Sequence, residues 1–186
     1  MLTVTPSQTV GPFFAILVPD RGRVTLRRTS SPGRPALIKG CIRDGAGRPV
    51  TDALVEVWQA NAAGQCNHPE DPSGSGRDKT FEGFGRVHAD SEGCFSVDTV
   101  KPGRVIGPEH RLQAPHLVVG LFARGLLTRL VTRVYFDDEP SNTDDPILAE
   151  ITPTRRSSLI ATTTGDGHYR FDIALQGPNE TVFFDV

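Results

Sequence analysis

The chain has 186 residues, enough for one domain with a substantial core, and its 37% hydrophobic and 23% charged content is typical of a soluble globular protein. The formal net charge is −2, with acidic and basic residues interspersed, which argues against a nucleic-acid partner. The sequence has no run of about 18 apolar residues and does not start with a signal-peptide pattern, so we expect no membrane span and no secretion.

The three cysteines are an odd number and form no Cys-x-x-Cys pair: Cys41, Cys66 and Cys94. This usage favours reduced thiols over a disulfide framework. We therefore expect a cytoplasmic protein.

Short apolar runs, bounded by turn residues, predict strands rather than long helices; 19 glycines and 15 prolines support many turns. In chain order, the predicted strands are residues 37–42, 53–59, 94–100, 116–123, 127–136, 169–175 and 181–185. Within the second strand, Val55 and Val57 alternate with Glu56 and Trp58, which predicts one buried face and one mixed face. As a lone tryptophan beside two valines, Trp58 is most simply a core residue.

The segments between the strands differ in composition. Residues 19–36 are rich in Pro, Gly, Ser and Arg and predict an irregular arm or loop, and residues 66–85 predict a long excursion. Residues 139–151 predict one or two helical turns, with Asp144 and Asp145 at a helix start. No repeat or linker divides the chain. We expect an all-β, single-domain β-sandwich over residues 1–186, with an N-terminal arm and loop at 1–36.

Candidate catalytic groups are few when the residues are considered alone. The five histidines form no His-x-His or His-Glu-x-x-His pair; they are His68, His88, His110, His116 and His168. Cys66 and His68, with His116 brought in by the fold, could form a zinc or copper site. The simpler interpretation, which we favour, is a loop cysteine and a solvated histidine.

Several segments, in order along the chain, carry a family resemblance. They are residues 5–13 (TPSQTVGPF), 55–68 (VEVWQANAAGQCNH), 100–103 (VKPG), 114–127 (APHLVVGLFARGLL), 132–138 (TRVYFDD) and 169–185. Together they resemble the intradiol ring-cleaving dioxygenases over nearly the whole chain, except for the variable stretches 17–36 and 69–80. The resemblance implies the β-sandwich of that family, in which two tyrosines and two histidines hold a non-haem ferric iron.

The resemblance also implies that most of the metal ligands are missing. It places the tyrosine positions at Cys66 and Val105 and the histidine positions at His116 and Val118. A valine cannot ligate a metal, and one imidazole alone does not hold ferric iron. Gln113 stands where the iron-binding chains have an arginine. We expect no metal in this chain, and we interpret His116 as a relic hydrogen-bonded to a neighbour.

Members of the family that cleave protocatechuate pair an iron-free alpha chain with a homologous beta chain that holds Fe(III). The resemblance implies that this chain is of the alpha type. It would complete the partner's site for O2-dependent cleavage of protocatechuate to 3-carboxy-cis,cis-muconate, in the beta-ketoadipate route of aromatic catabolism. The implied pocket residues are Thr9, Gly11, Pro12, Phe13 (where tyrosine is common) and Arg133.

Other interpretations remain open at this point. Thr9 to Pro12 could be only an arm docked on a partner, and strand alternation could simply place Arg133 outward. At the level of function, the alternatives are a non-catalytic β-sandwich binding module, an enzyme with a metal site rebuilt from Cys66, His68 and His116, and a dioxygenase subunit for a related catechol.

Overall fold

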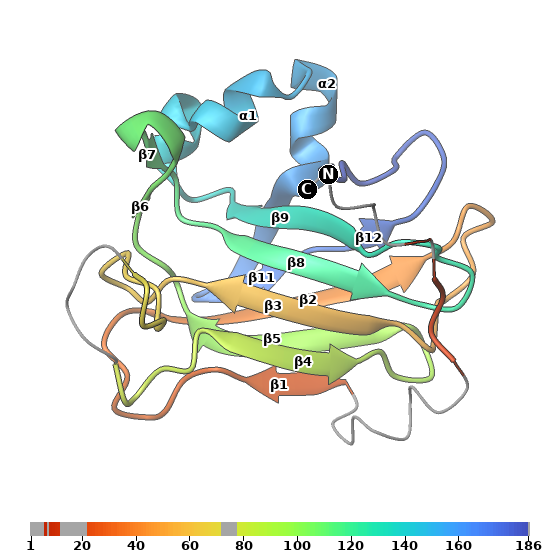
Figure 1. Cartoon of the computed structure of the whole chain (residues 1–186), viewed down its shortest axis with the longest axis horizontal. Coiled ribbons are helices and arrows are strands. Elements are labelled where there is room, and N and C mark those ends of the chain that lie inside the picture. Colours follow the sequence, from red (N-terminus) through yellow and green to blue (C-terminus); the bar gives the residue numbers. More distant parts are fainter. Residues whose placement is uncertain (1–5, 7, 12–21, 72–77, 186) are drawn as a thin grey trace.

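The computed structural model describes residues 6, 8–11, 22–71 and 78–185 (Figure 1). The strands are β1 Arg23–Thr25, β2 Pro35–Arg43, β3 Leu54–Gln59, β4 Phe84–His88, β5 Cys94–Val100, β6 Val105–Ile106, β7 Leu112–Gln113, β8 Leu117–Phe122, β9 Leu130–Phe136, β10 Ile160–Gly165, β11 His168–Arg170 and β12 Ile173–Ala174. The helices are short: η2 Pro108–His110, η3 Pro140–Asp144, α1 Pro146–Glu150, α2 Pro153–Arg156 and η4 Ser157–Leu159.

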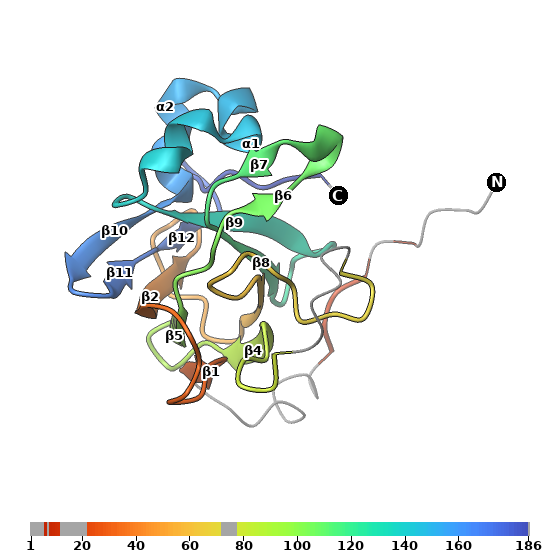
Figure 2. The same ribbon diagram turned by 90° about the vertical axis from the view of Figure 1, so that its left-hand side faces the viewer.

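One 10-stranded sheet makes up most of the fold, in the order β1-β5-β2-β11-β10-β9-β8-β3-β4, with β12 paired to β2. Its two ends approach each other next to β1 and β4 (Figure 2). There the Glu82 amide donates to the Leu26 carbonyl at 2.9 Å, and Arg27 forms an isolated bridge with Phe81. The sheet is therefore nearly closed, which limits its exposed edges.

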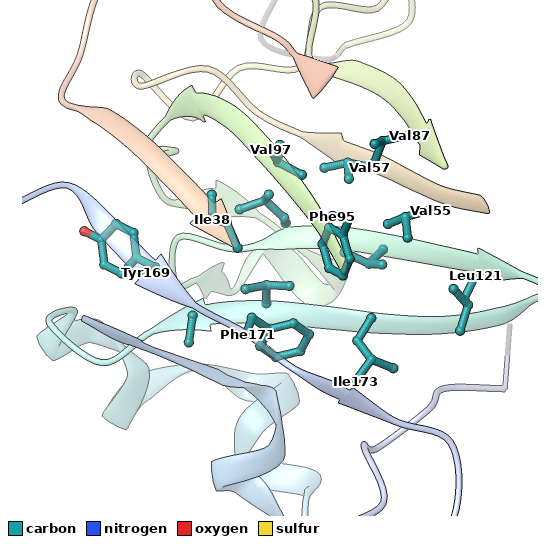
Figure 3. Close-up of a cluster of buried hydrophobic side chains, with 14 of the residues drawn as sticks. Ile38, Val55, Val57, Val87, Phe95, Val97, Leu121, Tyr169, Phe171 and Ile173 are labelled. Carbon is teal, nitrogen blue, oxygen red and sulfur yellow. The ribbon is translucent and has the colours of Figure 1, made fainter. Parts of the chain in front are cut away.

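The main core lies between the two halves of this sheet (Figure 3). Val55, Val57 and Leu121 enter it from β3 and β8, and Ile38 and Phe95 enter it from β2 and β5. These side chains are at most 4% exposed. The predicted all-β fold and the buried face of residues 53–59 are confirmed.

A second, smaller core lies on the opposite side of β9, under the helical segment 140–159. It contains Ala114, Tyr135, Leu148 and Leu159. Helix α1 starts at Asp145, whose side chain accepts the Ile147 and Leu148 amides at 2.9 and 2.8 Å, as an N-cap does. The predicted helical turns and the helix start at Asp144–Asp145 are confirmed, and they cover the end of β9.

Two predicted boundaries are wrong. Residues 181–185 form no strand, because only Phe184 pairs there, in an isolated bridge with Val131. Residues 19–36, predicted to be irregular, include β1 and the start of β2. Strand β1 has only three residues, and its parallel pairing with β5 holds it in place rather than its own composition.

The core assignment of Trp58 is also wrong. Its side chain is only half-buried and lies on the face of β3 opposite Val55 and Val57. Directly opposite Trp58 in the sheet are Phe84 on β4 and Val118 on β8. Successive side chains of a strand point to opposite faces of the sheet, so Trp58 must point away from the core that its neighbour Val57 enters.

The expectation of three reduced thiols is wrong as well, since Cys41 and Cys94 form a disulfide. The antiparallel register of β2 and β5 sets them directly opposite each other, although they are 53 residues apart in sequence. Cys66 is the free cysteine. Among the helices of the described residues, none is both long and apolar enough to cross a membrane.

Candidate functional site

The face of β8 and β9 turned away from the main core carries Val118, one of the positions to which the family resemblance assigns a metal ligand. Val118 lies directly opposite Arg133 on β9 and opposite Trp58 on β3. Val105 lies opposite Gln113 in the β6–β7 hairpin. Because residues opposite each other in an antiparallel pair point to the same face, Trp58, Val118 and Arg133 form one row.

Two buried polar side chains hold the guanidinium of Arg133. Its Nη1 donates to Oε1 of Gln113 at 2.7 Å and to the hydroxyl of Tyr135 at 3.2 Å. Gln113 is 4% exposed and Tyr135 is fully buried. A Cβ at Gly107 would lie 1.9 Å from Nε2 of Gln113, so the missing side chain at Gly107 leaves room for the Gln113 amide.

Asp145 anchors the other side of this network. Its Oδ1 accepts the Tyr135 hydroxyl at 3.2 Å, and its Oδ2 accepts the Ala114 amide at 2.7 Å. The carboxylate is fully buried. Burial raises the pKa of Tyr135, so this hydroxyl stays protonated and donates to Asp145 while it accepts from Arg133.

His116 lies beside the same network. Its ring centre is 5.5 Å from that of Tyr135, and its Nδ1 donates to the Ala114 carbonyl at 2.8 Å. Burial, with a smaller contribution from the positive charge of Arg133, lowers the pKa of His116 to about 4. The interpretation of His116 as a neighbour-bonded histidine is confirmed. The ring is neutral at pH 7.

Cys66 and His68 lie on the Trp58 side of the row. The His68 ring is 6.0 Å from that of Trp58, and the Cys66 amide donates to the Asp71 carboxylate. Burial raises the pKa of the Cys66 thiol, with a smaller contribution from Asp71, and a protonated thiol is a poor metal ligand. Within the described ranges, Cys66, His68 and His116 belong to no group of three side chains that could hold a metal ion.

Of the predicted N-terminal pocket residues, Thr9 lies elsewhere, at the β8–β9 turn. The Thr9 hydroxyl accepts the Gly125 amide at 3.2 Å, and the Gln8 amide donates to the Leu127 carbonyl at 2.9 Å. Thr9 borders a cavity of about 400 Å³, together with Arg129 and the 62% exposed Leu127. Gly11 is exposed, and Pro12 and Phe13 lie outside the described residues.

The structure does not bring Thr9 and Arg133 together. Arg133 is three residues along β9 from Leu130, the last residue paired with β8 before the turn, or about 10 Å at the usual rise of a strand. In Figure 1 the segment with Thr9 (red) lies near the β8–β9 turn, whereas the β6–β7 hairpin that holds Gln113 lies towards the other end of these strands.

Arg124 is a candidate that sequence reasoning missed. It precedes Gly125, the residue bonded to Thr9, and its side chain is 76% exposed and paired with the Asp52 carboxylate. Exposed ion pairs of this kind contribute little to stability, so Arg124 is free to exchange partners. The only signal in the sequence was an arginine beside a glycine in an expected turn.

Comparison with known proteins identifies the family of the chain. A family model described as Dioxygenase (Dioxygenase_C) matches residues 10–177. The chain is 42% identical to the protocatechuate 3,4-dioxygenase alpha chain of Burkholderia cepacia and 39% identical to that of Pseudomonas putida, covering 100% of this chain and 98% of each relative. It is 37% identical to the beta chain from Burkholderia cepacia, over 80% of this chain and 67% of the relative.

Solved structures share the fold. A dioxygenase domain from Streptomyces sp. SirexAA-E is 28% identical with a TM-score of 0.60, covering 92% of this chain and 97% of that one. Catechol 1,2-dioxygenase from Acinetobacter sp. ADP1 has a TM-score of 0.67 at 22% identity, covering 87% of this chain and 60% of that one. The arrangement of strands is therefore shared among these proteins even where sequence identity is low.

Proposed function

The chain belongs to the Dioxygenase family of intradiol ring-cleaving enzymes, and on this basis we propose that it is the iron-free alpha subunit of a protocatechuate 3,4-dioxygenase. In the assembly a homologous beta chain would hold the ferric iron and bind the substrate's adjacent hydroxyls. The reaction is the O2-dependent opening of the protocatechuate ring between those hydroxyls, which yields 3-carboxy-cis,cis-muconate.

The observation that carries this proposal is the content of the aligned metal positions. Val105 and Val118 offer no ligand atom, and Cys66 offers a soft sulfur where the family has the hard oxygen of a tyrosine. His116 alone does not fit ferric iron, and the arginine cation opposite Val118 makes the position less suitable still. Identity to alpha chains over the full length supports the same conclusion.

We assign the contribution to the partner's pocket to the N-terminal segment, as the family resemblance implies: Thr9, Gly11, Pro12 and Phe13. The Thr9–Gly125 hydrogen bond fastens this segment to the β8–β9 turn. A glycine followed by a proline offers little side-chain bulk, so a substrate can approach the backbone closely. A wall of this kind would exclude water and orient the ring, and orientation alone can supply a large part of a rate enhancement.

The resemblance assigns a substrate-binding arginine to Arg133, and the geometry favours Arg124 for that role. Arg124 stands beside the segment that Thr9 fastens, with an exposed guanidinium. Such a group can bind a substrate carboxylate through paired, charge-assisted hydrogen bonds. Arg133 already uses Nη1 to donate to Gln113 and Tyr135.

A comparison of two variants tests the site. We expect Arg124→Gln, in the complex with a beta chain, to lower kcat/KM for protocatechuate at least about tenfold, the effect of one lost charge-assisted contact. Catechol, which lacks the carboxylate, should be affected much less. Arg133→Gln should not show this substrate dependence. If Arg133→Gln, and not Arg124→Gln, lowered kcat/KM selectively for protocatechuate, Arg133 would be the pocket residue. If neither variant had an effect, neither arginine would belong to the pocket.

A further proposal concerns the cell compartment. We place the assembled enzyme in the cytoplasm. A disulfide between Cys41 and Cys94 is unusual in that compartment. Immunodetection in cytoplasmic and periplasmic fractions of the source cells tests the assignment, and a periplasmic signal would overturn it.

A further inference from the structure

Arg133 is a cation without an acidic partner. Among the described residues, no carboxylate lies within ion-pair distance of its guanidinium. Its neighbours are the neutral groups of Gln113 and Tyr135, and the ring of Phe184 at 5.8 Å. The carboxylate of Asp145 lies one residue further away, behind the Tyr135 hydroxyl, and its effect on the pKa of His116 is smaller than that of Arg133. Near His116 the positive charge therefore outweighs the negative one, and a half-buried charge repels other cations because little water screens it.

The charge stands among the positions that would surround a metal. Val118 is directly opposite Arg133, and Gln113, which accepts from Arg133, is opposite Val105. His116 packs on Tyr135, to which Arg133 also donates. Of the four positions that the resemblance assigns to ligands, His116 is the one with an imidazole, and it packs on the tyrosine to which the guanidinium donates.

Arg133 is also rigidly placed. Gln113 and Tyr135 are buried and the Asp145 carboxylate accepts from Tyr135, so three residues from separate segments fix where the charge lies. A solvent-exposed arginine could swing away from an incoming metal ion. This one would have to break two hydrogen bonds to do so.

From this geometry we infer that Arg133 excludes metal cations from the degenerate site of this chain. The loss of ligands at Cys66, Val105 and Val118 removes affinity for a metal, and the fixed charge of Arg133 adds active repulsion. The chain would then bind metal only weakly even when a single substitution restores a ligand here. This inference concerns the lone chain and does not depend on the proposed catalytic partnership.

The test restores one ligand and then varies the charge. Val118→His places an imidazole on the same face as His116, two residues away along extended backbone. In this background, position 133 is kept as Arg or changed to Gln, Met or Lys. Binding of Zn²⁺ to the full chain is measured by isothermal titration calorimetry.

We expect both neutral variants, V118H/R133Q and V118H/R133M, to bind Zn²⁺ at least about tenfold more tightly than V118H. The repulsion between charges within roughly 6 Å, at an effective dielectric of about 20, exceeds the free energy of a tenfold change in affinity. Two neutral replacements are used so that the comparison still holds if one of the two variants does not fold. The V118H/R133K chain, which keeps the charge but loses the planar fork, should bind as weakly as V118H.

Adding His116→Ala to V118H/R133Q should abolish the gain, which locates the ion at this site. Equal affinity with Arg and with the neutral residues would overturn the inference. Tight binding by the Lys variant would also overturn it, because relief of crowding rather than loss of charge would then explain the gain. A gain that survives His116→Ala would place the ion elsewhere and count against it too.

Discussion

At Asp145, a single buried carboxylate connects three parts of the chain. It caps α1 through the Ile147 and Leu148 amides, accepts the Ala114 amide before β8, and accepts the Tyr135 hydroxyl on β9. Buried donors that lose their acceptor are costly, because folding has already removed them from water. Asp145 should therefore be among the most sensitive single residues outside the main core.

We predict that Asp145→Ala lowers the free energy of unfolding by about 3 kcal/mol, the sum of a lost helix cap and of buried donors left without an acceptor. Urea denaturation of the purified chain measures the change. The adjacent Asp144 is exposed, and Asp144→Ala should change stability by less than about 0.5 kcal/mol. Similar losses for the two variants would contradict the account of the network.

His116 makes the free energy of unfolding depend on pH, and the direction of this dependence follows from its lowered pKa. Its folded-state pKa is about 4, compared with 6.5 for an unperturbed histidine, so the unfolded chain binds more protons between these values. The contribution of His116 to stability is therefore complete above about pH 6.5 and is lost as the pH falls towards 4. The full shift corresponds to at most about 3 kcal/mol.

We predict that His116→Gln flattens the fall in stability between pH 7 and pH 4.5, as measured by denaturant titrations at about these two values. His168→Gln, at an exposed position, serves as the matched control. A His116→Gln chain with the same pH dependence as the parent would show that His116 is not held neutral by the fold.

Some of the candidate site was predictable from individual residues, and some was not. The family resemblance predicts missing ligands at Val105 and Val118, because a valine side chain has no ligand atom, and this stays a prediction. The hydrogen bond of His116 to a neighbour was predicted and is present. The bond from Arg133 to Gln113 was not predictable. It joins a strand to a hairpin 20 residues away in sequence, and only the register of the two strand pairs brings the side chains together.

At the scale of elements, Gly40 in the middle of β2 shows how tightly the sheet is assembled. A Cβ at this position would lie 1.8 Å from the backbone carbonyl of Phe171 and 3.0 Å from the ring of Phe95. The Phe171 amide also donates to the Lys39 carbonyl at 2.8 Å, which holds the two chain segments together. The Phe171 carbonyl cannot move aside without breaking this pairing.

We predict that Gly40→Ala destabilises the chain by more than about 2 kcal/mol, as overpacking against backbone does. Thermal and urea unfolding would measure the loss. A Cβ at Gly47 would meet no atom within 4 Å, but the residue has a φ of +76°. Gly47→Ala should therefore cost only the strain of that conformation, about 1 kcal/mol. A Gly40→Ala chain no less stable than Gly47→Ala would contradict the close approach to Phe171.

Long strands with buried valines or leucines were predictable, and short ones were not. The runs at 53–59 and 94–100 coincide with β3 and β5 because their alternating apolar residues fill the core. Strands β1, β6 and β7 have two or three residues, too few to show a period, and they exist because neighbouring segments pair with them. Strand β10 was missed because half of its six residues are exposed threonines and only Ala161 is buried.

At the scale of the whole molecule, the chain keeps the fold of its family. The nearly closed sheet encloses the main core, and the helical segment over β9 covers a second, smaller one. Hydrophobic burial in these two clusters stabilises the chain.

The metal content of the lone chain and of its complex tests the central claim most directly. The chain would be purified alone, and separately after co-expression with a homologous beta chain, and iron would be measured in each sample by elemental analysis. The account predicts essentially no iron in the lone chain and about one ferric ion per alpha–beta pair, with oxygen uptake on protocatechuate only in the complex. About one ferric ion bound to the lone chain would contradict it.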